Sequence, residues 1–322
     1  MATWMISFRD FMLQKVQEYY ASLPFVGKDF YTAPELDKAF GYAIGDFLSQ
    51  YLQSYPVVLE LGAGNGTLAY DLLTFFEEKG LNVEYIIYET STSLKKFQSK
   101  RLERFFNKVH WVDRLPDTFE GVVISNEFFD CFPVRVIKGW KELFVKDGEA
   151  FWKEIQDKRV FEFIRRMGYE NVDTLLEVCL DCIDFLKELS SRLSKGYILT
   201  IDYGYRHPLE VPQGTVVGYK GHRLVQDVLK EEGTFDVTAS VNFQALVEYG
   251  RDFGLETVFL KRLREFLLSS EGFMKELQEL PLREDPESIQ RLSRIKNILI
   301  SMGERFWVLF QQKAHRSLSS SS

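Results

Sequence analysis

The fold of this chain is decided by the stretch Pro56-Val57-Val58-Leu59-Glu60-Leu61-Gly62-Ala63-Gly64-Asn65-Gly66-Thr67. Its apolar first half predicts a short buried strand, and its second half predicts a glycine-rich turn that leads into a helix beginning near Leu68. The glycines allow backbone conformations closed to other residues and let the main chain come into contact with a bound molecule. Their spacing, Gly-x-Gly-x-Gly, differs from the Gly-x-Gly-x-x-Gly of dinucleotide sites. The alternative interpretation is a tight strand-to-helix turn without a ligand.

An acidic residue follows about one strand–helix unit later. The β-rich apolar run Val83–Tyr88 ends on Glu89, which lies 23 residues after Gly66. A nucleotide-type ligand in such a fold needs an acid about 20 positions past the glycines, where its carboxylate accepts hydrogen bonds from the ribose hydroxyls. The glycine turn and Glu89 together therefore predict a ligand site at the carboxyl ends of the strands. A surface glutamate that happens to end a strand is the alternative.

Length, composition and charge limit the class of protein. The chain has 322 residues, of which 45% are hydrophobic and 27% charged, as expected of one large globular domain with insertions. The net charge of −7 argues against non-specific nucleic-acid binding, which needs a basic surface. No apolar run approaches the length of a membrane span, and no signal-type segment is recognisable. We therefore expect a cytoplasmic protein without membrane insertion.

The cysteines and histidines predict no metal site and no disulfide framework. The three cysteines are Cys131, Cys179 and Cys182, and the last two lie in a helical pattern without a second ligand pair. The four histidines show no metal-binding spacing. The serine-rich residues 317–322 are expected to be disordered.

Strand and helix patterns alternate along the rest of the chain. Helices are expected over 4–22 and from Pro34 to Leu48, followed after Glu89 by a helix near 91–106, a strand over 109–112 and a fourth strand over 121–125. The next segments are β-hairpins between 135 and 152, a long helix at about 172–193 and a fifth strand over 197–204. A loop-rich stretch over 205–240 follows. The chain then continues with a helix over 243–253, a strand over 256–260, helices to about 302 and a final strand over 305–310.

Further motifs accompany the glycine turn in a fixed order. They are Asp29–Glu35, Glu60–Thr67, Glu89–Ser91 with Leu94 and Gln98, Asn126–Asp130 with Pro133 and Val134, Asp202–Gly204, His222 and Arg223, Asp236–Thr238, Val241–Phe243, and Met302–Phe306. In these segments, over nearly its whole length, the chain resembles the MidA-type methyltransferases. That family includes a mitochondrial protein-arginine methyltransferase needed to assemble respiratory complex I. The chain departs from the family pattern at Lys28 and Asn242, where glycine and aspartate are usual.

The resemblance implies an α/β, Rossmann-like class I methyltransferase fold with S-adenosyl-L-methionine (SAM) as cofactor. We expect a mostly parallel seven-stranded sheet whose last strand is antiparallel. The expected division is a helical segment over 1–55 that contributes to the cofactor site and a core over 56–316. Helical and β-hairpin insertions at about 131–171, 205–240 and 263–302 are expected to form a cap at the carboxyl ends of the strands.

The expected cofactor-binding residues follow from the glycine turn, the strand ends and the resemblance. They are Phe30, Thr32, Glu60, Gly62, Gly64, Gly66, Glu89, Asp113 and Asn126. Asp113 follows the third strand, where an acid in many SAM enzymes accepts from the adenine amino group. It could equally be a turn residue before Leu115 and Pro116.

Four residues are candidates for the acceptor side of the site: Glu127, Asp130, Asp202 and His222. Carboxylates can steer a cationic acceptor, and they bind the rigid donor fork of a guanidinium in bidentate geometry. Glu127 follows the fourth strand, one sheet position from the first strand. Its alternative is a turn or capping residue, Asp130 could be a first-turn helix acid, and His222 could be structural. Asp202 ends the fifth strand and competes with Glu127.

These observations predict a SAM-dependent methyltransferase that acts on a protein, with arginine favoured by the resemblance and a respiratory-complex subunit as one candidate. The alternatives are a non-catalytic SAM-binding assembly or scaffold factor and a small-molecule methyltransferase. A nucleic-acid acceptor is disfavoured, because residues 126–129 lack the Asn-Pro-Pro-Tyr type motif of many such enzymes. The oligomeric state is left open.

Overall fold

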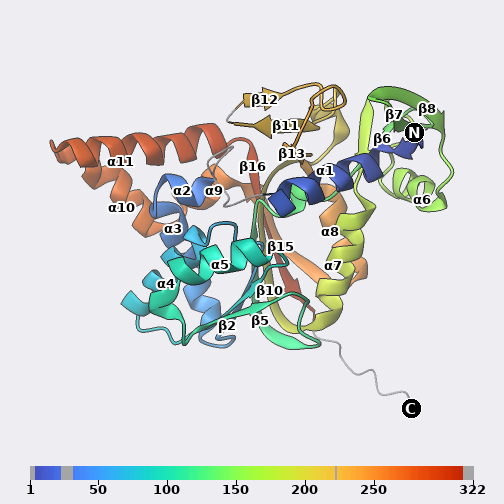
Figure 1. The fold of residues 1–322 in the computed structure, drawn as a ribbon. Coiled ribbons are helices and arrows are strands. Elements are labelled where there is room, and N and C mark those ends of the chain that lie inside the picture. The colour runs from blue at the N-terminus through green and yellow to red at the C-terminus, as the bar shows by residue number, and fades with distance from the viewer. Residues whose placement is uncertain (1–3, 23–31, 222, 315–322) are drawn as a thin grey trace, which may run out of the picture.

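In the computed structural model, which describes residues 4–22, 32–221 and 223–314, a seven-stranded sheet forms the centre (Figure 1). Its order is β15-β16-β10-β5-β2-β3-β4, and the two-residue β14 (Val241–Asn242) extends it beside the end of β10. The strands are β2 (Val57–Leu61), β3 (Glu84–Tyr88), β4 (Val109–Val112), β5 (Phe119–Asn126), β10 (Leu193–Tyr205), β15 (Leu255–Arg262) and β16 (Phe306–Lys313). All neighbours are parallel except β16, which is antiparallel to both β10 and β15. The predicted fold is confirmed.

Helices cover both faces of this sheet, because its central strands are apolar on both sides. Val58 and Leu59 are neighbours on β2, and both are fully buried, in separate core clusters. Since successive side chains of a strand point to opposite faces, each cluster belongs to one face. The first cluster includes residues of α3 (Ala39–Leu52) and α4 (Thr67–Glu78), and the second includes residues of α7 (Leu180–Arg192) and α8 (Phe243–Asp252). The helix α5 (Thr92–Arg101) connects β3 to β4 through the short η1 (Glu103–Phe105).

The first insertion forms a second, antiparallel sheet. It contains β6 (Arg135–Lys138), β7 (Lys141–Lys146), β8 (Glu149–Glu154) and β9 (Leu175–Val178), together with β1 (Ile6–Ser7) from the start of the described chain. The predicted hairpins are confirmed, and α6 (Lys158–Arg166) follows them. The predicted helix over 172–193 is wrong in its first part, since residues 175–178 pair with β6. The apolar run there suits either element, and Glu177 stabilises the strand by accepting hydrogen bonds from the backbone of Thr215 and Val216.

The second insertion was predicted as a loop-rich stretch, but the structure has a small antiparallel sheet there. Its strands are β11 (Val217–Lys220), β12 (Arg223–Val225) and β13 (Asp236–Thr238), preceded by η3 (Pro208–Glu210). Three-residue strands between glycines give too short a pattern to distinguish from loop. The helix α1 (Phe8–Ser22) packs against both small sheets through a shared apolar cluster that includes Phe8, Met12, Val136 and Phe235.

The third insertion is helical, with α9 (Leu263–Leu268), α10 (Glu271–Glu279), η4 (Leu280–Leu282), α11 (Pro286–Asn297) and the π-helical turn η5 (Ile298–Met302). In Figure 1 the three insertions lie at the top of the view, at the end of the sheet that α1 crosses. The short helix α2 (Ala33–Leu36) contacts α3, α4 and η5.

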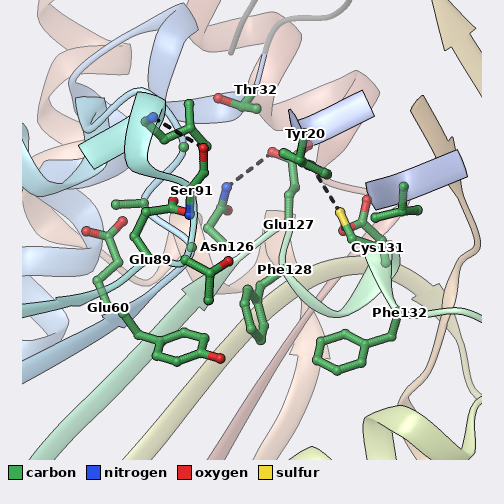
Figure 2. Close-up of a pocket in the computed structure, with 18 of the residues that line it drawn as sticks. Tyr20, Thr32, Glu60, Glu89, Ser91, Asn126, Glu127, Phe128, Cys131 and Phe132 are labelled. Atoms are coloured by element: carbon green, nitrogen blue, oxygen red, sulfur yellow. Dashed lines mark hydrogen bonds between the residues drawn. The ribbon is translucent and has the colours of Figure 1, made fainter. Parts of the chain in front are cut away.

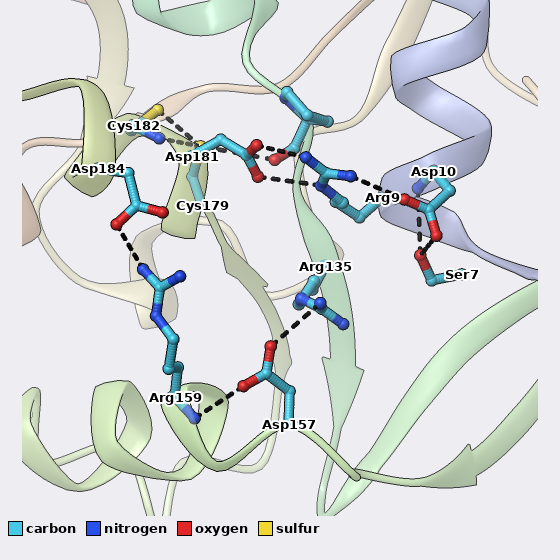
Figure 3. A network of polar contacts seen from close by, with 11 residues as sticks. Ser7, Arg9, Asp10, Arg135, Asp157, Arg159, Cys179, Asp181, Cys182 and Asp184 are labelled. Carbon is cyan, nitrogen blue, oxygen red and sulfur yellow. Dashed lines mark hydrogen bonds and ion pairs between the residues drawn. The ribbon is translucent and has the colours of Figure 1, made fainter.

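Two arginine–aspartate pairs connect these added parts to the rest. Arg9 of α1 binds Asp181 in the first turn of α7 through two bonds, of 3.1 and 2.5 Å (Figure 3). Arg291 of α11 binds Asp37, between α2 and α3, through bonds of 3.1 and 3.0 Å. The Asp37 side chain is only 3% exposed. Removing the Arg291 side chain would therefore leave the buried charge of Asp37 without a close ion-pair partner.

We expect Arg291→Met to lower the free energy of unfolding by about 3 kcal/mol, because the buried carboxylate of Asp37 then lacks its main ion-pair partner. Arg294, at 3.7 Å from Asp37, replaces only part of the interaction. Urea denaturation followed by circular dichroism measures the change. The control is Arg283→Met. Among the described residues the Arg283 side chain forms only an exposed ion pair with Glu279, so this variant should change stability by less than about 0.5 kcal/mol. Equal losses in the two variants would contradict this account of Asp37.

Candidate active site

The glycine turn after β2 has the backbone that its sequence predicts. Gly62, Gly64 and Gly66 have φ angles of 63°, 53° and 79°, in the left-handed region that favours glycine. A Cβ atom added at Gly62 would lie 2.7 Å from the ring of Phe128, closer than real contacts allow. The turn is therefore fixed both by its own conformation and by the aromatic ring that packs against it.

A hydrogen-bonded chain ties this turn to the N-terminal segment. The Asn65 side-chain oxygen accepts from the backbone N–H and the hydroxyl of Thr67, at 3.1 and 2.7 Å, while its amide donates to Glu35. Glu35 in turn accepts from the backbone N–H of Thr32 at 2.9 Å. Thr32 is therefore held at the rim of the turn by a residue of α2.

Glu89 lies where the sequence predicts, after β3. One of its oxygens accepts from the N–H of Ser91 at 2.9 Å, and the other accepts from the Gln98 amide at 3.2 Å. The same amide donates to the carbonyl of Gly64 at 2.8 Å, and the Gln98 oxygen accepts from Trp111. Gln98 is fully buried and thus joins Glu89 to the glycine turn. No function had been derived for Gln98 from the sequence pattern.

A cavity of about 430 Å³ opens between these elements and α1. Its lining includes Thr32, Glu60, Gly62, Gly64, Glu89, Asn126, Glu127 and Asp130 from the predicted site, and Leu13, Val16, Gln17 and Tyr20 from α1. In Figure 2, Glu60, Glu89 and Ser91 lie on one side, Tyr20, Cys131 and Phe132 lie on the other, and Asn126 and Glu127 lie between them. The cavity thus has two ends that meet at the end of β5.

The remaining predicted residues lie elsewhere. Gly66 caps the start of α4, where an added Cβ atom would contact Gln98 at 3.5 Å. Asp113 lines a separate hollow with Lys95 and Arg114. Phe30 and His222, like residues 317–322, lie outside the described residues.

Glu127 occupies the junction of the two ends in an unusual backbone conformation. Its φ angle is 50°, a value that non-glycine residues rarely adopt and that occurs in turns and at functional sites. The amide of Asn126 donates to its carboxylate at 3.1 Å. Burial, with the nearby charge of Asp130, raises the pKa of Glu127 to about 8, against the opposing effect of the Asn126 amide and the backbone N–H of Ala33.

Asp202 does not line the cavity, contrary to the expectation that it competes with Glu127 for the acceptor. It is fully buried, and one oxygen accepts from the N–H groups of Phe128, Phe129 and Asp130 at 3.2, 3.0 and 3.3 Å. These residues lead into the 3₁₀ turn η2 (Phe129–Cys131). Asp202 therefore positions this turn. Asp130 faces the cavity, accepts from the hydroxyl of Tyr203, and has a pKa raised by burial.

The cavity is acidic. Its lining carries the carboxyl groups of Glu60, Glu89, Glu127 and Asp130, and no lysine, arginine or histidine among the described residues. Burial raises the pKa of Glu60 to about 7, although the hydroxyl of Tyr85 donates to it at 2.7 Å. A cationic ligand would lower the cost of keeping these groups ionised, because opposite charges favour the charged form.

The sequence predicted that the helical segment over 1–55 contributes to the cofactor site, but it identified no residue of α1 in the cavity wall. Leu13, Gln17 and Tyr20 are spaced i, i+4 and i+7, so they form one stripe of the helix. Phe8, Met12 and Tyr19 on the same helix are buried and belong to its core face. The second stripe is the signal that could have revealed this wall. The Tyr20 hydroxyl lies 3.3 Å from the sulfur of Cys131.

The described residues contain no group of three or more histidine, cysteine, aspartate or glutamate side chains arranged to hold a metal ion. None of their helices is long and apolar enough to cross a membrane. The three cysteines are free thiols, and the sulfurs of Cys179 and Cys182 lie 2.6 Å apart at the start of α7.

Residues 44–260 match the model of a family described as "Putative S-adenosyl-L-methionine-dependent methyltransferase". The chain is 26% identical to the Danio rerio protein named "Protein arginine methyltransferase NDUFAF7, mitochondrial", over 92% of this chain and 80% of that protein. It is 27% identical to the Homo sapiens protein of the same name, over 74% of this chain and 63% of that protein.

Two solved structures from Burkholderia thailandensis are similar over 96% of this chain. The native crystal structure of an uncharacterized protein has a TM-score of 0.82 and 29% identity, and the alignment covers 87% of that protein. A superfamily member bound to S-adenosyl-homocysteine has a TM-score of 0.79 and 28% identity, with 88% of that protein covered.

The pKa of Glu127 gives a test of the geometry at the junction. Its folded-state value of about 8 exceeds the ordinary value of 4.5, so the folded state binds this proton more tightly than the unfolded chain. Stability from this group is therefore present below about pH 4.5 and is lost as the pH rises through about 8. Glu127→Gln removes this titration. The free energy of unfolding of the variant, minus that of the wild type, should therefore increase by about 2–4 kcal/mol between about pH 5 and pH 9.

Urea denaturation at several pH values measures this difference. Glu120→Gln, at the exposed start of the same strand, is the matched control and should keep a constant difference from the wild type. A difference that does not change with pH for Glu127→Gln would show that its carboxyl is not buried in the way the structure describes.

Proposed function

The chain belongs to this family of S-adenosyl-L-methionine-dependent methyltransferases, and on that premise we propose that it methylates an arginine side chain of a protein. The cofactor follows from the family and from the similar structure that holds S-adenosyl-homocysteine. The arginine acceptor is the finer step, and it is supported by the names of the curated relatives and by the acidic junction at Glu127.

The residues of the cavity fit SAM. A volume of about 430 Å³ lies in the range of small-molecule sites, and the glycine turn lets the main chain approach the ligand. Glu89 lines the cavity at the strand end where this fold binds ribose hydroxyls. The side-chain oxygen of Asn126 is buried and has no hydrogen-bond partner among the described residues, so a ligand donor could satisfy it. When bound, SAM supplies an electrophilic methyl group on a positively charged sulfur.

The single observation that carries the arginine proposal is the position of Glu127. It lies between the end with the glycine turn and Glu89 and the end with Tyr20 and Phe132 (Figure 2). A guanidinium entering from the second end meets a carboxylate that can bind its donor fork, and aromatic rings on which it can stack. Asp130 adds negative charge beside this path. We propose that Glu127 holds and orients the acceptor and does not bind the cofactor.

Transfer of label from SAM tests the function. The protein is incubated with methyl-labelled SAM and a lysate of its own organism, and mass spectrometry then locates the label. Respiratory-complex subunits are candidates to examine first, given the family that the sequence resembles. Methylarginine is the expected product. Label on a small molecule would support the alternative acceptor, and SAM binding without any product would support a scaffold function.

Gly64→Ala should weaken SAM binding at least tenfold, about 1.4 kcal/mol, because Gly64 lines the cavity and a methyl group there takes up ligand space. Titration calorimetry measures the affinity. The matched control is Gly80→Ala, whose φ of 67° imposes a similar backbone strain while its added Cβ meets no atom within 4 Å. If both variants bind SAM as the wild type does, the glycine turn is not the cofactor site.

Glu127→Gln should reduce turnover ten- to a hundredfold, since it removes a charge-assisted contact worth about 1.5–3 kcal/mol, and should leave SAM affinity nearly unchanged. Because the pKa of Glu127 is about 8 in the free protein, wild-type kcat/KM should rise with pH as this group ionises, and the variant should lose that rise. Initial rates between about pH 6 and pH 10 measure the effect, with Glu120→Gln as control. Loss of SAM binding in step with activity would assign Glu127 to the cofactor.

A further inference from the structure

The strand β8 is an exposed edge of the five-stranded sheet. All six of its residues are exposed, and it pairs only with β7, in an unbroken register from Lys141 opposite Glu154 to Lys146 opposite Glu149. Within the described chain, no backbone bond reaches its outer side. β8 lies at the periphery of the molecule (Figure 1). Such an edge presents free N–H and C=O groups to another strand.

This edge carries apolar surface beside its charged side chains. Phe151 and Trp152 are 37% and 40% exposed, and they point to opposite faces because they are neighbours on a strand. No proline or bulge interrupts residues 149–154. Edge strands are commonly protected by such devices or by charges. The charges here are Glu149, Lys153 and Glu154, which differ in sign along the strand.

We propose that β8 pairs antiparallel with β8 of a second copy of this chain, about a two-fold axis at Phe151. In this register Glu149 lies opposite Lys153 of the second copy, and Lys153 lies opposite its Glu149, which gives two ion pairs on one face. Phe151 meets Phe151 between them. On the other face Trp152 lies over Ala150 of the second copy, a large residue opposite a small one. The two ion pairs and the aromatic pair are favourable.

Neighbouring registers lack this complementarity. With the axis between Phe151 and Trp152, Glu149 would face Glu154, and like charges opposite each other are destabilising. With the axis at Trp152, Phe151 would face Lys153 and Ala150 would face Glu154. Of these three axes, only the one at Phe151 pairs charges of opposite sign, and we therefore favour this register.

The charges are available, and the strand is held in place. Among the described residues neither Glu149 nor Lys153 has an ion-pair partner, and Lys153 only lies over the ring of Phe144, at 5.0 Å. The sheet behind β8 is anchored by Arg135, which binds the buried Glu142 of β7 at 2.6 Å and Asp157 before α6 at 3.2 Å (Figure 3). A pre-ordered edge loses little conformational entropy on pairing.

Sedimentation of the full chain between about 1 and 100 µM tests the dimer, in the range expected of a small interface. The wild type should form dimers in this range. Glu149→Lys and Lys153→Glu should each weaken dimerisation at least tenfold, because each places like charges opposite one another twice. Lys187→Glu, an equal charge change at an exposed position of α7, is the control and should dimerise as the wild type does. Circular dichroism checks that each variant is folded.

Mixing the two variants is the decisive measurement. In a heterodimer of Glu149→Lys with Lys153→Glu, the unchanged Lys153 and Glu149 pair as in the wild type, and the two substituted positions form the second ion pair with its signs reversed. The equimolar mixture should therefore dimerise where each variant alone does not. A wild-type chain that stays monomeric over the whole range overturns the proposal. So does a mixture that stays monomeric, which would mean another register or another surface.

Discussion

Three consecutive backbone N–H groups, those of Phe128, Phe129 and Asp130, donate to one buried oxygen of Asp202. The other oxygen accepts from Tyr203. Burying a carboxylate away from water costs free energy unless hydrogen-bond donors surround it, so this arrangement fixes the chain after β5. The positive φ of Glu127 immediately before it, the turn η2 and the direction of Asp130 all follow from that constraint. Both ends of the cavity therefore depend on a residue that never touches it.

Acidic side chains line both ends of the cavity. Four carboxyl groups line it without a basic side chain among the described residues, and burial raises the pKa of at least Glu60 and Glu127 towards or above neutrality. Such groups repel one another when ionised and are satisfied by a cation. Opposite charge favours the ionised form of these groups, so the site suits cationic SAM and the guanidinium that we propose as acceptor.

Much of the fold and part of the site could be predicted from the sequence, because their signals are local. The glycine turn, Glu89 and the alternation of strands and helices each occupy a short window, and the structure has them where the pattern predicts. Asp202 was misassigned because a strand-end acid looks the same whether it faces a ligand or a backbone turn more than 70 residues away in sequence. The residues of α1 that line the cavity were not identified, although their i, i+4 and i+7 spacing was a signal, and the bridging contact of Gln98 shows only in the packing. Strand β9 was missed because its apolar run suits a helix equally well.

The position of β16 has a consequence for biosynthesis. This strand comes last of those in the central sheet, yet it lies between β10 and β15 and bonds to both. During translation β10 and β15 therefore emerge from the ribosome with no strand between them, and their apolar edges stay open until residues 306–313 arrive. Contacts this distant in sequence form slowly, and open edges invite aggregation. Chaperone demand on this chain should thus be greatest just before its last sheet strand is released.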